Sequence, residues 1–178
     1  MHPNSMVIMK EFVEKYKIKS ETVVDVGSYD INGTYKSLFP EAKYIGADNT
    51  LGPNVDVIMD SPEWDELSDV DYVISGQTLE HVADIPKLMA SIFRVLKSGG
   101  ILCMIVPSEG PRHDYPIWVG NFSKERMTEC VESAGFEVID CIISPVPPFN
   151  DNCCVARKPE KVEIKQKTAK RKDYDETE

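Results

Sequence analysis

The sequence predicts an α/β protein with a seven-stranded, mostly parallel sheet and one antiparallel strand near the C-terminus. Short apolar strands alternate with amphipathic helices along the chain, which is typical of a parallel sheet with helices on both faces, in three layers. The last two strands, 136–143 and 153–156, follow one another without an intervening helix. We expect this pair to be antiparallel, because a parallel crossover needs about a dozen residues or more.

The first half of the chain supplies one long helix and most of the parallel strands. Apolar residues at positions i, i+3, i+4 and i+7 predict a helix over residues 6–17, with Ser5 as its cap. A buried strand follows at Thr22–Val26, and a short helix at Tyr35–Leu38 ends before Pro40. Further strands are expected at 43–47, 55–59 and 71–75.

The second half contains the most strongly amphipathic helix. Asp84 caps it, Pro86 lies in its first turn and Gly99 is expected to end it. The continuous apolar run Ile101–Val106 is typical of a strand that is buried on both faces of a parallel sheet. Another helix is expected within residues 123–135, before the final pair of strands.

Length and charge indicate a single acidic domain. A chain of 178 residues can form one domain with a proper core, which we place at residues 1–157. Residues 158–178 are nearly free of apolar side chains and are expected to be a charged, flexible tail. The net charge is −10; the segment from Arg157 onward carries +2, from eight basic and six acidic residues, which leaves −12 for the body. This charge argues against nucleic-acid binding and suits a cationic ligand.

The remaining composition favours the cytoplasm. No apolar run approaches the ~20 residues that cross a bilayer. The N-terminal residues lack the basic and apolar regions of a signal peptide, so no membrane association is expected. Five cysteines lack metal-ligand spacing, and most lie in apolar strand-like segments, as buried thiols do in a reducing compartment.

A nucleoside-binding pattern lies at the start of the predicted sheet. An apolar strand runs into a turn at Gly27, and the next strand ends about 20 residues later at Asp48. Such a glycine lets the backbone approach a ligand, and such a carboxylate can accept hydrogen bonds from ribose hydroxyls. A dinucleotide fingerprint would need glycines where Tyr29 and Asn32 stand. The pattern therefore favours S-adenosylmethionine, an adenosine with a small charged tail, over NAD.

Four motifs in this order and spacing resemble one known family. They are Asp25–Gly33, Tyr44–Val57, Val73–His81 and Val106–His113. Over about residues 20–157 the chain resembles class I S-adenosylmethionine-dependent methyltransferases. More narrowly, it is similar to small bacterial methyltransferases associated with polysaccharide biosynthesis. The resemblance implies a Rossmann-like three-layer sandwich with S-adenosylmethionine as its cofactor.

The resemblance also implies which residues bind that cofactor. Residues after the first and fourth strands would hold its methionine end, Asp48 would bind the ribose, and residues after the second and third strands would flank the adenine. The implied set is Asp25, Gly27, Ser28, Tyr29, Asp48, Asn49, Asp60, Ser61, Ser75, Gly76 and Gln77. Tyr29 and Ile31 replace two glycines of the commonest family turn.

Three side chains after the fourth and fifth strands are candidates for catalysis. A sugar hydroxyl needs a base to remove its proton, and His113 is the first candidate, with Glu80 or His81 as the alternative. Local packing, capping or turn formation would explain both histidines equally well. Some methyltransferases hold a divalent metal with Glu-x-x-Glu-His and a distant His. Here Gln77 replaces the first Glu, which weakens affinity for Mg²⁺, so we expect no metal.

The sequence thus predicts an S-adenosylmethionine-dependent methyltransferase that transfers methyl by in-line displacement to oxygen of a small polar or glycan-related acceptor. A non-catalytic S-adenosylmethionine-binding subunit or sensor is the main alternative, and a NAD-dependent oxidoreductase is the weaker one. Residues 107–122 offer little material to enclose a large acceptor. A second copy of the chain or a partner protein could therefore complete the acceptor site.

Overall fold

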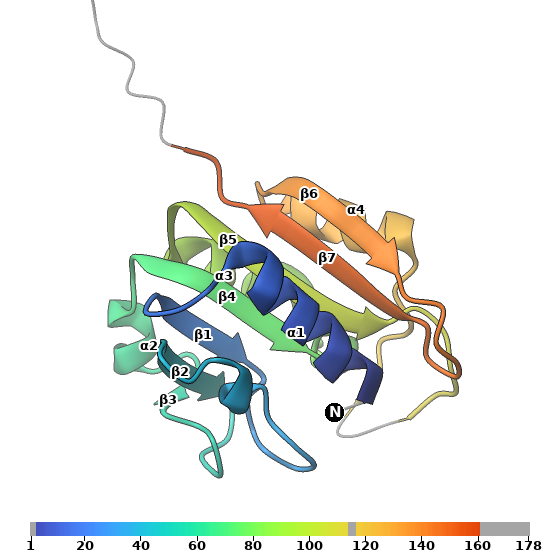
Figure 1. The fold of residues 1–178 in the computed structure, drawn as a ribbon, viewed down its shortest axis with the longest axis horizontal. Coiled ribbons are helices and arrows are strands. Elements are labelled where there is room, and N and C mark those ends of the chain that lie inside the picture. The colour runs from blue at the N-terminus through green and yellow to red at the C-terminus, as the bar shows by residue number, and fades with distance from the viewer. Residues whose placement is uncertain (1–2, 114–116, 161–178) are drawn as a thin grey trace, which may run out of the picture.

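A computed structural model describes residues 3–113 and 117–160. Its centre is a seven-stranded sheet in the order β3-β2-β1-β4-β5-β7-β6 (Figure 1). The strands are β1 (Thr22–Val26), β2 (Lys43–Asp48), β3 (Val57–Ile58), β4 (Val70–Gly76), β5 (Leu96–Pro107), β6 (Glu137–Ile143) and β7 (Asp151–Arg157). The described strand pairs are parallel except for the two that β7 makes, with β5 and with β6. The predicted sheet with a single reversed strand is therefore confirmed.

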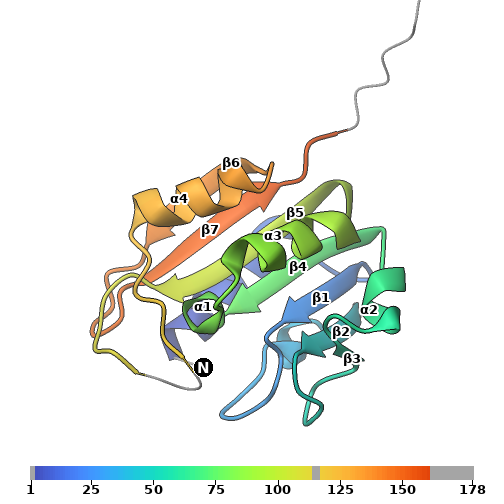
Figure 2. The ribbon, with the colours of Figure 1, turned by 180° about the vertical axis from the view of Figure 1, so that it is seen from behind.

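Helices cover both faces of the sheet. The helix α1 (Pro3–Tyr16) crosses one face, on which the short 3-10 helix η1 (Lys36–Leu38) also packs (Figure 1). The opposite face carries α2 (Pro62–Glu66), α3 (Ile85–Val95) and α4 (Lys124–Ser133), as Figure 2 shows. A second 3-10 turn, η2 (Leu79–His81), follows β4. The arrangement is the predicted three-layer sandwich.

The strand β5 joins the two apolar cores. Its residues Cys103 and Ile105 pack in the cluster beneath α1, whereas Leu102 and Met104 belong to the cluster beneath α3 and α4. All four side chains are fully buried. Because successive side chains of a strand point to opposite faces, burial of both sets explains the continuous apolar run in the sequence.

The end of α3 differs from the prediction. The helix was expected to continue to Gly99, but it ends at Val95, and Leu96 already pairs with Val70 of β4. A lysine that lies far away in sequence caps this end. The Nζ of Lys158 donates to the carbonyl of Leu96 at 2.6 Å, which supplies a partner to one of the acceptors that a helix end exposes.

The helix α2 was not predicted. Its N-terminus is capped by Ser61, whose Oγ accepts a hydrogen bond from the N–H of Trp64 at 3.3 Å. The indole of Trp64 is 1% exposed, and its Nε1 donates to Ser91 Oγ of α3 at 2.7 Å. These contacts fix a helix of only five residues that would be unstable alone.

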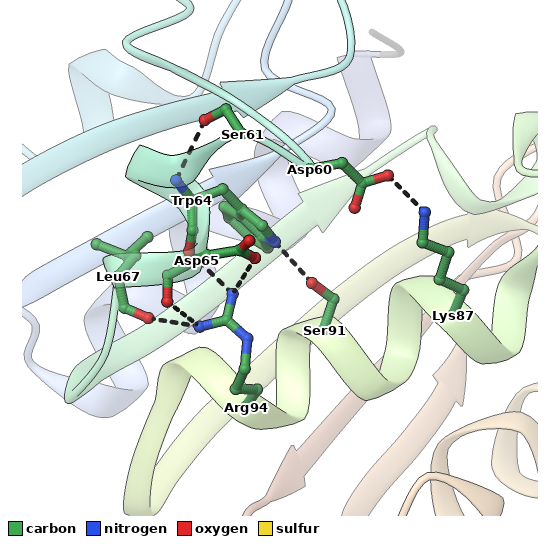
Figure 3. A network of polar contacts seen from close by, with 8 residues as sticks. All are labelled: Asp60, Ser61, Trp64, Asp65, Leu67, Lys87, Ser91 and Arg94. Carbon is green, nitrogen blue, oxygen red and sulfur yellow. Dashed lines mark hydrogen bonds and ion pairs between the residues drawn. The ribbon is translucent and has the colours of Figure 1, made fainter.

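A guanidinium group holds the other end of α2. Arg94 of α3 donates to three backbone carbonyls at the C-terminal end of α2 (Figure 3). The distances are 2.9 Å to the carbonyl oxygens of Trp64 and Asp65 and 3.0 Å to that of Leu67. Hydrogen bonds from a charged donor are stronger than neutral ones. Arg94 therefore couples the position of α2, and of the loop before it, to α3.

Most of the predicted tail, residues 161–178, lies outside the described residues, so the domain boundary at 157 stays a prediction. Lys158 itself is anchored, since its N–H donates to the carbonyl of Gly100 at 2.9 Å. Among the helices within 3–113 and 117–160, none combines the length and the apolar character needed to cross a membrane.

We predict that Arg94→Ala lowers the free energy of unfolding by about 1–3 kcal/mol, because the carbonyls at the end of α2 lose their charged donor. Denaturant unfolding measures the change. Lys10→Ala is the control, since the ion pair of Lys10 with Glu14 is exposed and 3.9 Å long. Equal, small effects of the two substitutions would show that Arg94 does not hold α2.

Candidate active site

The predicted site residues gather at one edge of the sheet. The parallel strands β1, β2, β4 and β5 end there at Val26, Asp48, Gly76 and Pro107. Because β7 is reversed, its first residue, Asp151, pairs with Pro107 and lies at the same edge. Ligands of open α/β sheets bind at this edge.

The turn after β1 packs tightly against its neighbours. Gly27 has a φ of +81°, and a Cβ at this position would lie 2.1 Å from Thr78 Oγ1, so only glycine fits. The N–H of Gly27 donates to the carbonyl of Ala47 at 2.8 Å, and that of Tyr29 donates to Asp48 Oδ2 at 3.2 Å. These N–H groups point at β2, so the backbone contacts that we expected with a cofactor stay a prediction.

Asp25 is a buried carboxylate beneath this turn. It is 3% exposed and accepts a short hydrogen bond from the hydroxyl of Tyr44. Burial raises the pKa of Asp25 to about 7; the Tyr44 hydrogen bond opposes this rise, and the negative charge of Asp48 adds to it. Asn54 completes the support by donating to the carbonyl of Ser28 at 3.0 Å. Tyr44 and Asn54 lie within the motif Tyr44–Val57, but the sequence analysis gave them no role, because their contacts with Asp25 and Ser28 appear only in the fold.

Asp48 keeps capacity to bind a ligand. Its carboxylate accepts from the N–H groups of Tyr29 and Thr50, each at 3.2 Å, and a carboxylate can accept about four hydrogen bonds. Asn49 is exposed beside it. The ring of Tyr29 packs against Gly52, because a Cβ added to Gly52 would lie only 2.2 Å from a ring carbon of Tyr29. This contact joins the two loops that would flank an adenosine.

Asp60 and Ser61 already have partners within the protein. Asp60 Oδ2 accepts from Lys87 Nζ of α3 at 2.6 Å in an exposed ion pair, and Ser61 caps α2 (Figure 3). Both residues follow β3 at the ligand-binding edge, as predicted. Their contact with an adenine amino group stays a prediction.

The last two residues of β4 and the residue after it are three of the predicted site residues. Ser75 Oγ donates to a carbonyl of β1 at 2.8 Å, and a Cβ on Gly76 would lie 2.0 Å from the hydroxyl oxygen of Tyr35. Gln77 has a φ of +56°, and its Nε2 donates to Asp151 Oδ1 at 2.8 Å. The sequence analysis missed Asp151, which is 74 residues from Gln77. The last strand was expected at 153–156, so Asp151 fell outside it, whereas the strand begins at Asp151 in the structure.

The three catalytic candidates form a cluster. Glu80 is fully buried, and neither of its carboxylate oxygens has a hydrogen-bond partner elsewhere in residues 3–113 and 117–160. His81 Nε2 lies 3.8 Å from Glu80 Oε1, and the rings of His81 and His113 meet edge to face with centroids 5.1 Å apart. Burial raises the pKa of Glu80 to about 8, and the charge of Asp151 acts in the same direction.

Backbone carbonyls fix the orientation of both imidazoles. His81 Nδ1 lies 2.6 Å from the carbonyl oxygen of Ile117, and His113 Nδ1 lies 3.1 Å from that of Pro111. A carbonyl can only accept, so Nδ1 carries the proton in each ring. In the neutral tautomer, each histidine therefore presents an Nε2 lone pair.

We predict that Asp25 makes stability fall as pH rises. The folded protein holds this proton up to about pH 7, whereas the unfolded chain releases it near the ordinary pKa of 3.8. Between these values the unfolded state binds fewer protons, so stability decreases with pH. Relative to Asp25→Asn, the wild-type protein should lose roughly 2 kcal/mol of unfolding free energy between pH 5 and pH 8. Parallel pH profiles from denaturant titrations would contradict this assignment.

The centre of the chain is similar to known methyltransferases. Residues 45–104 match the methyltransferase domain family. The matched segment runs from β2 into β5 and includes Asp48, Gln77 and Glu80. A Mycolicibacterium smegmatis protein, named a probable S-adenosylmethionine-dependent methyltransferase, is 33% identical over 79 residues, which are 41% of this chain. The chain spans about a third of the length of that relative, at 31%.

Solved methyltransferase structures share the fold. The Burkholderia thailandensis 1,6-didemethyltoxoflavin-N1-methyltransferase, with 1,6-didemethyltoxoflavin and S-adenosylhomocysteine bound, superposes with a TM-score of 0.68 at 19% identity, over 87% of this chain and 78% of that one. A complex of the Haloferax volcanii Trm112 methyltransferase activator with a methyltransferase gives a TM-score of 0.57 at 18% identity, over 89% and 95%. The predicted Rossmann-like fold is confirmed.

Proposed function

We propose that the protein is an S-adenosylmethionine-dependent methyltransferase whose cofactor lies across the ends of β1, β2 and β4. The observation that carries the proposal is the placement of Asp48 beside the tight Gly27 turn, within a segment that matches the methyltransferase domain family. The Burkholderia enzyme of the same fold binds S-adenosylhomocysteine, which supports this choice of ligand. The acidic body of the chain suits a ligand that carries positive charge.

The protein's task in such a transfer is mainly positional. The sulfonium is already activated: the acceptor atom forms a bond to the methyl carbon while the bond from carbon to sulfur breaks, and sulfur leaves as a neutral thioether. Holding the two reactants in line can contribute about 7–11 kcal/mol. The rigid strand ends and the tightly packed turn at Gly27 provide such fixed positions.

The cluster of Glu80, His81 and His113 marks the acceptor side. It lies at the ends of β4 and β5, where the acceptor would meet the methyl group, and it combines two imidazoles with a carboxylate. An oxygen acceptor must lose a proton during the transfer, and such groups can assist this loss. We therefore propose O-methylation of a small polar or glycan-related acceptor. The Burkholderia enzyme is an N1-methyltransferase, so the shared fold is compatible with nitrogen as well.

A non-catalytic subunit remains the competing candidate. It would bind S-adenosylmethionine through the same residues but show no turnover with any acceptor. The Trm112 complex gives an example of the fold with a partner protein, and it supports the proposal that a partner or a second copy completes the acceptor site here. The missing glycines at Tyr29 and Asn32 disfavour an oxidoreductase that binds NAD.

We predict that S-adenosylmethionine and S-adenosylhomocysteine stabilise the protein and that NAD does not. Ligand at ~100 times its dissociation constant adds ~2.7 kcal/mol, which a thermal-unfolding experiment detects as a shift of several degrees. Asp48→Ala should weaken this binding at least about tenfold, because the ribose loses its acceptor. Glu132→Ala, an exposed change on α4, is the control. Stabilisation by NAD alone would refute the proposal.

We predict that His113→Ala lowers turnover with an acceptor and leaves cofactor affinity nearly unchanged, because His113 belongs to the cluster on the acceptor side. Steady-state kinetics and calorimetric titration with S-adenosylhomocysteine separate the two effects. Full activity of the variant would remove His113 from the reaction. A parallel loss of cofactor affinity would place it in the cofactor site instead.

A further inference from the structure

We propose that Glu80, His81 and His113 bind a divalent transition-metal ion. The three residues come from two separate loops, η2 after β4 and the segment after β5, and each offers one ligand atom. These three atoms lie within 4.8 Å of one another. Two histidines and one carboxylate are a recurrent ligand set of zinc and of non-haem iron(II).

The histidines are oriented as metal ligands are. A histidine that binds a metal through one ring nitrogen almost always donates the other N–H to a carbonyl or carboxylate. Here both Nδ1 atoms face backbone carbonyls, that of Ile117 for His81 and that of Pro111 for His113. The Nε2 atoms are therefore the available donors. Two histidines with the same supporting contact are hard to explain by packing alone.

Glu80 supplies an independent observation. Its side chain is completely buried, and both carboxylate oxygens lack a hydrogen-bond partner elsewhere in the described residues. Burial of such a polar group is unfavourable unless a partner compensates it. The Nε2 of His81 lies 3.8 Å from Glu80 Oε1, which is too far for a hydrogen bond. A cation between the carboxylate and the two Nε2 atoms would compensate all three groups.

The spacing requires only a small adjustment. Zinc lies about 2.0–2.2 Å from nitrogen and oxygen ligands, so two ligands of one ion are at most about 4.2 Å apart. Atoms that lie within 4.8 Å must therefore approach by no more than roughly 0.6 Å. His113 lies in the long connection after β5 and can make this movement more readily than η2, whose backbone accepts a hydrogen bond from the N–H of Val119 at 2.8 Å.

The ligand chemistry selects the type of metal. Magnesium and calcium prefer oxygen ligands, so the neutral Gln77 in place of a carboxylate disfavours Mg²⁺, as the sequence indicated. That argument does not apply to zinc or iron(II), which bind imidazole well. Three protein ligands also leave a coordination position open. Provided that the proposed function holds, an ion held by these three residues would supply a Lewis acid on the acceptor side, which would lower the pKa of an acceptor hydroxyl and favour release of its proton to solvent.

Zinc titration of the metal-free, full-length protein tests the site without cofactor or acceptor. Isothermal titration calorimetry should detect one tight Zn²⁺ site per chain. His113→Ala and Glu80→Gln should each weaken this binding by about 100-fold or more, since loss of a mere supporting contact already costs about 10- to 100-fold. Glu80→Gln preserves shape, and circular dichroism checks that both variants are folded. His2→Ala, which removes the third histidine of the chain, and Glu132→Gln are the matched controls.

Two results would overturn the proposal. One is the absence of zinc binding by the wild-type protein. The other is binding that survives both cluster substitutions, or that only His2→Ala abolishes, which would assign the metal to the cysteines or to the N-terminal region. Failure of either kind leaves the cofactor experiment untouched, since thermal stabilisation by S-adenosylhomocysteine is measured in metal-free protein. Conversely, a protein that binds zinc but not the cofactor would refute only the methyltransferase proposal and would leave the metal site standing.

Discussion

Burial of β5 on both faces is the constraint on which the rest of the molecule depends. Its side chains alternate between the core beneath α1 and the core beneath α3 and α4, so neither helical layer can form without it. It also pairs with β4 on one side and with the reversed β7 on the other. Through these two ladders Gly76, Pro107 and Asp151 reach the same edge of the sheet, and the functional loops follow from that alignment.

The site edge is unusual for the number of carboxylates that it buries. Asp25, Glu80 and Asp151 are each at most 3% exposed, and burial raises the pKa of the first two. Burying such groups lowers stability, and proteins commonly retain features of this kind where function requires them. One end of the edge holds Asp25, beneath the turn at Gly27. The other end, at Glu80, belongs to the cluster with the histidines.

The sequence predicted those features that depend on local pattern. The apolar run of β5 and the missing helix before β7 were sufficient to predict the sheet, and the strand ends were sufficient to bring Glu80 and His113 to one edge. Features that depend on distant partners were missed. The five residues of α2 carry little helical signal, and their contacts with Arg94 form only in the fold. The end of α3 is capped by Lys158, more than sixty residues away. Asp151 was missed for the same reason.

The contact of Lys158 with α3 links two elements that are far apart in the chain. Its Nζ lies 2.6 Å from the carbonyl oxygens of both Phe93 and Leu96, and 4.7 Å from the centroid of the Phe93 ring. A residue just beyond the last strand thus completes a helix that is made much earlier during synthesis. The end of α3 therefore gains these two hydrogen bonds only after residue 158 has been synthesised, whereas β5 can already pair with β4, which precedes it in the chain.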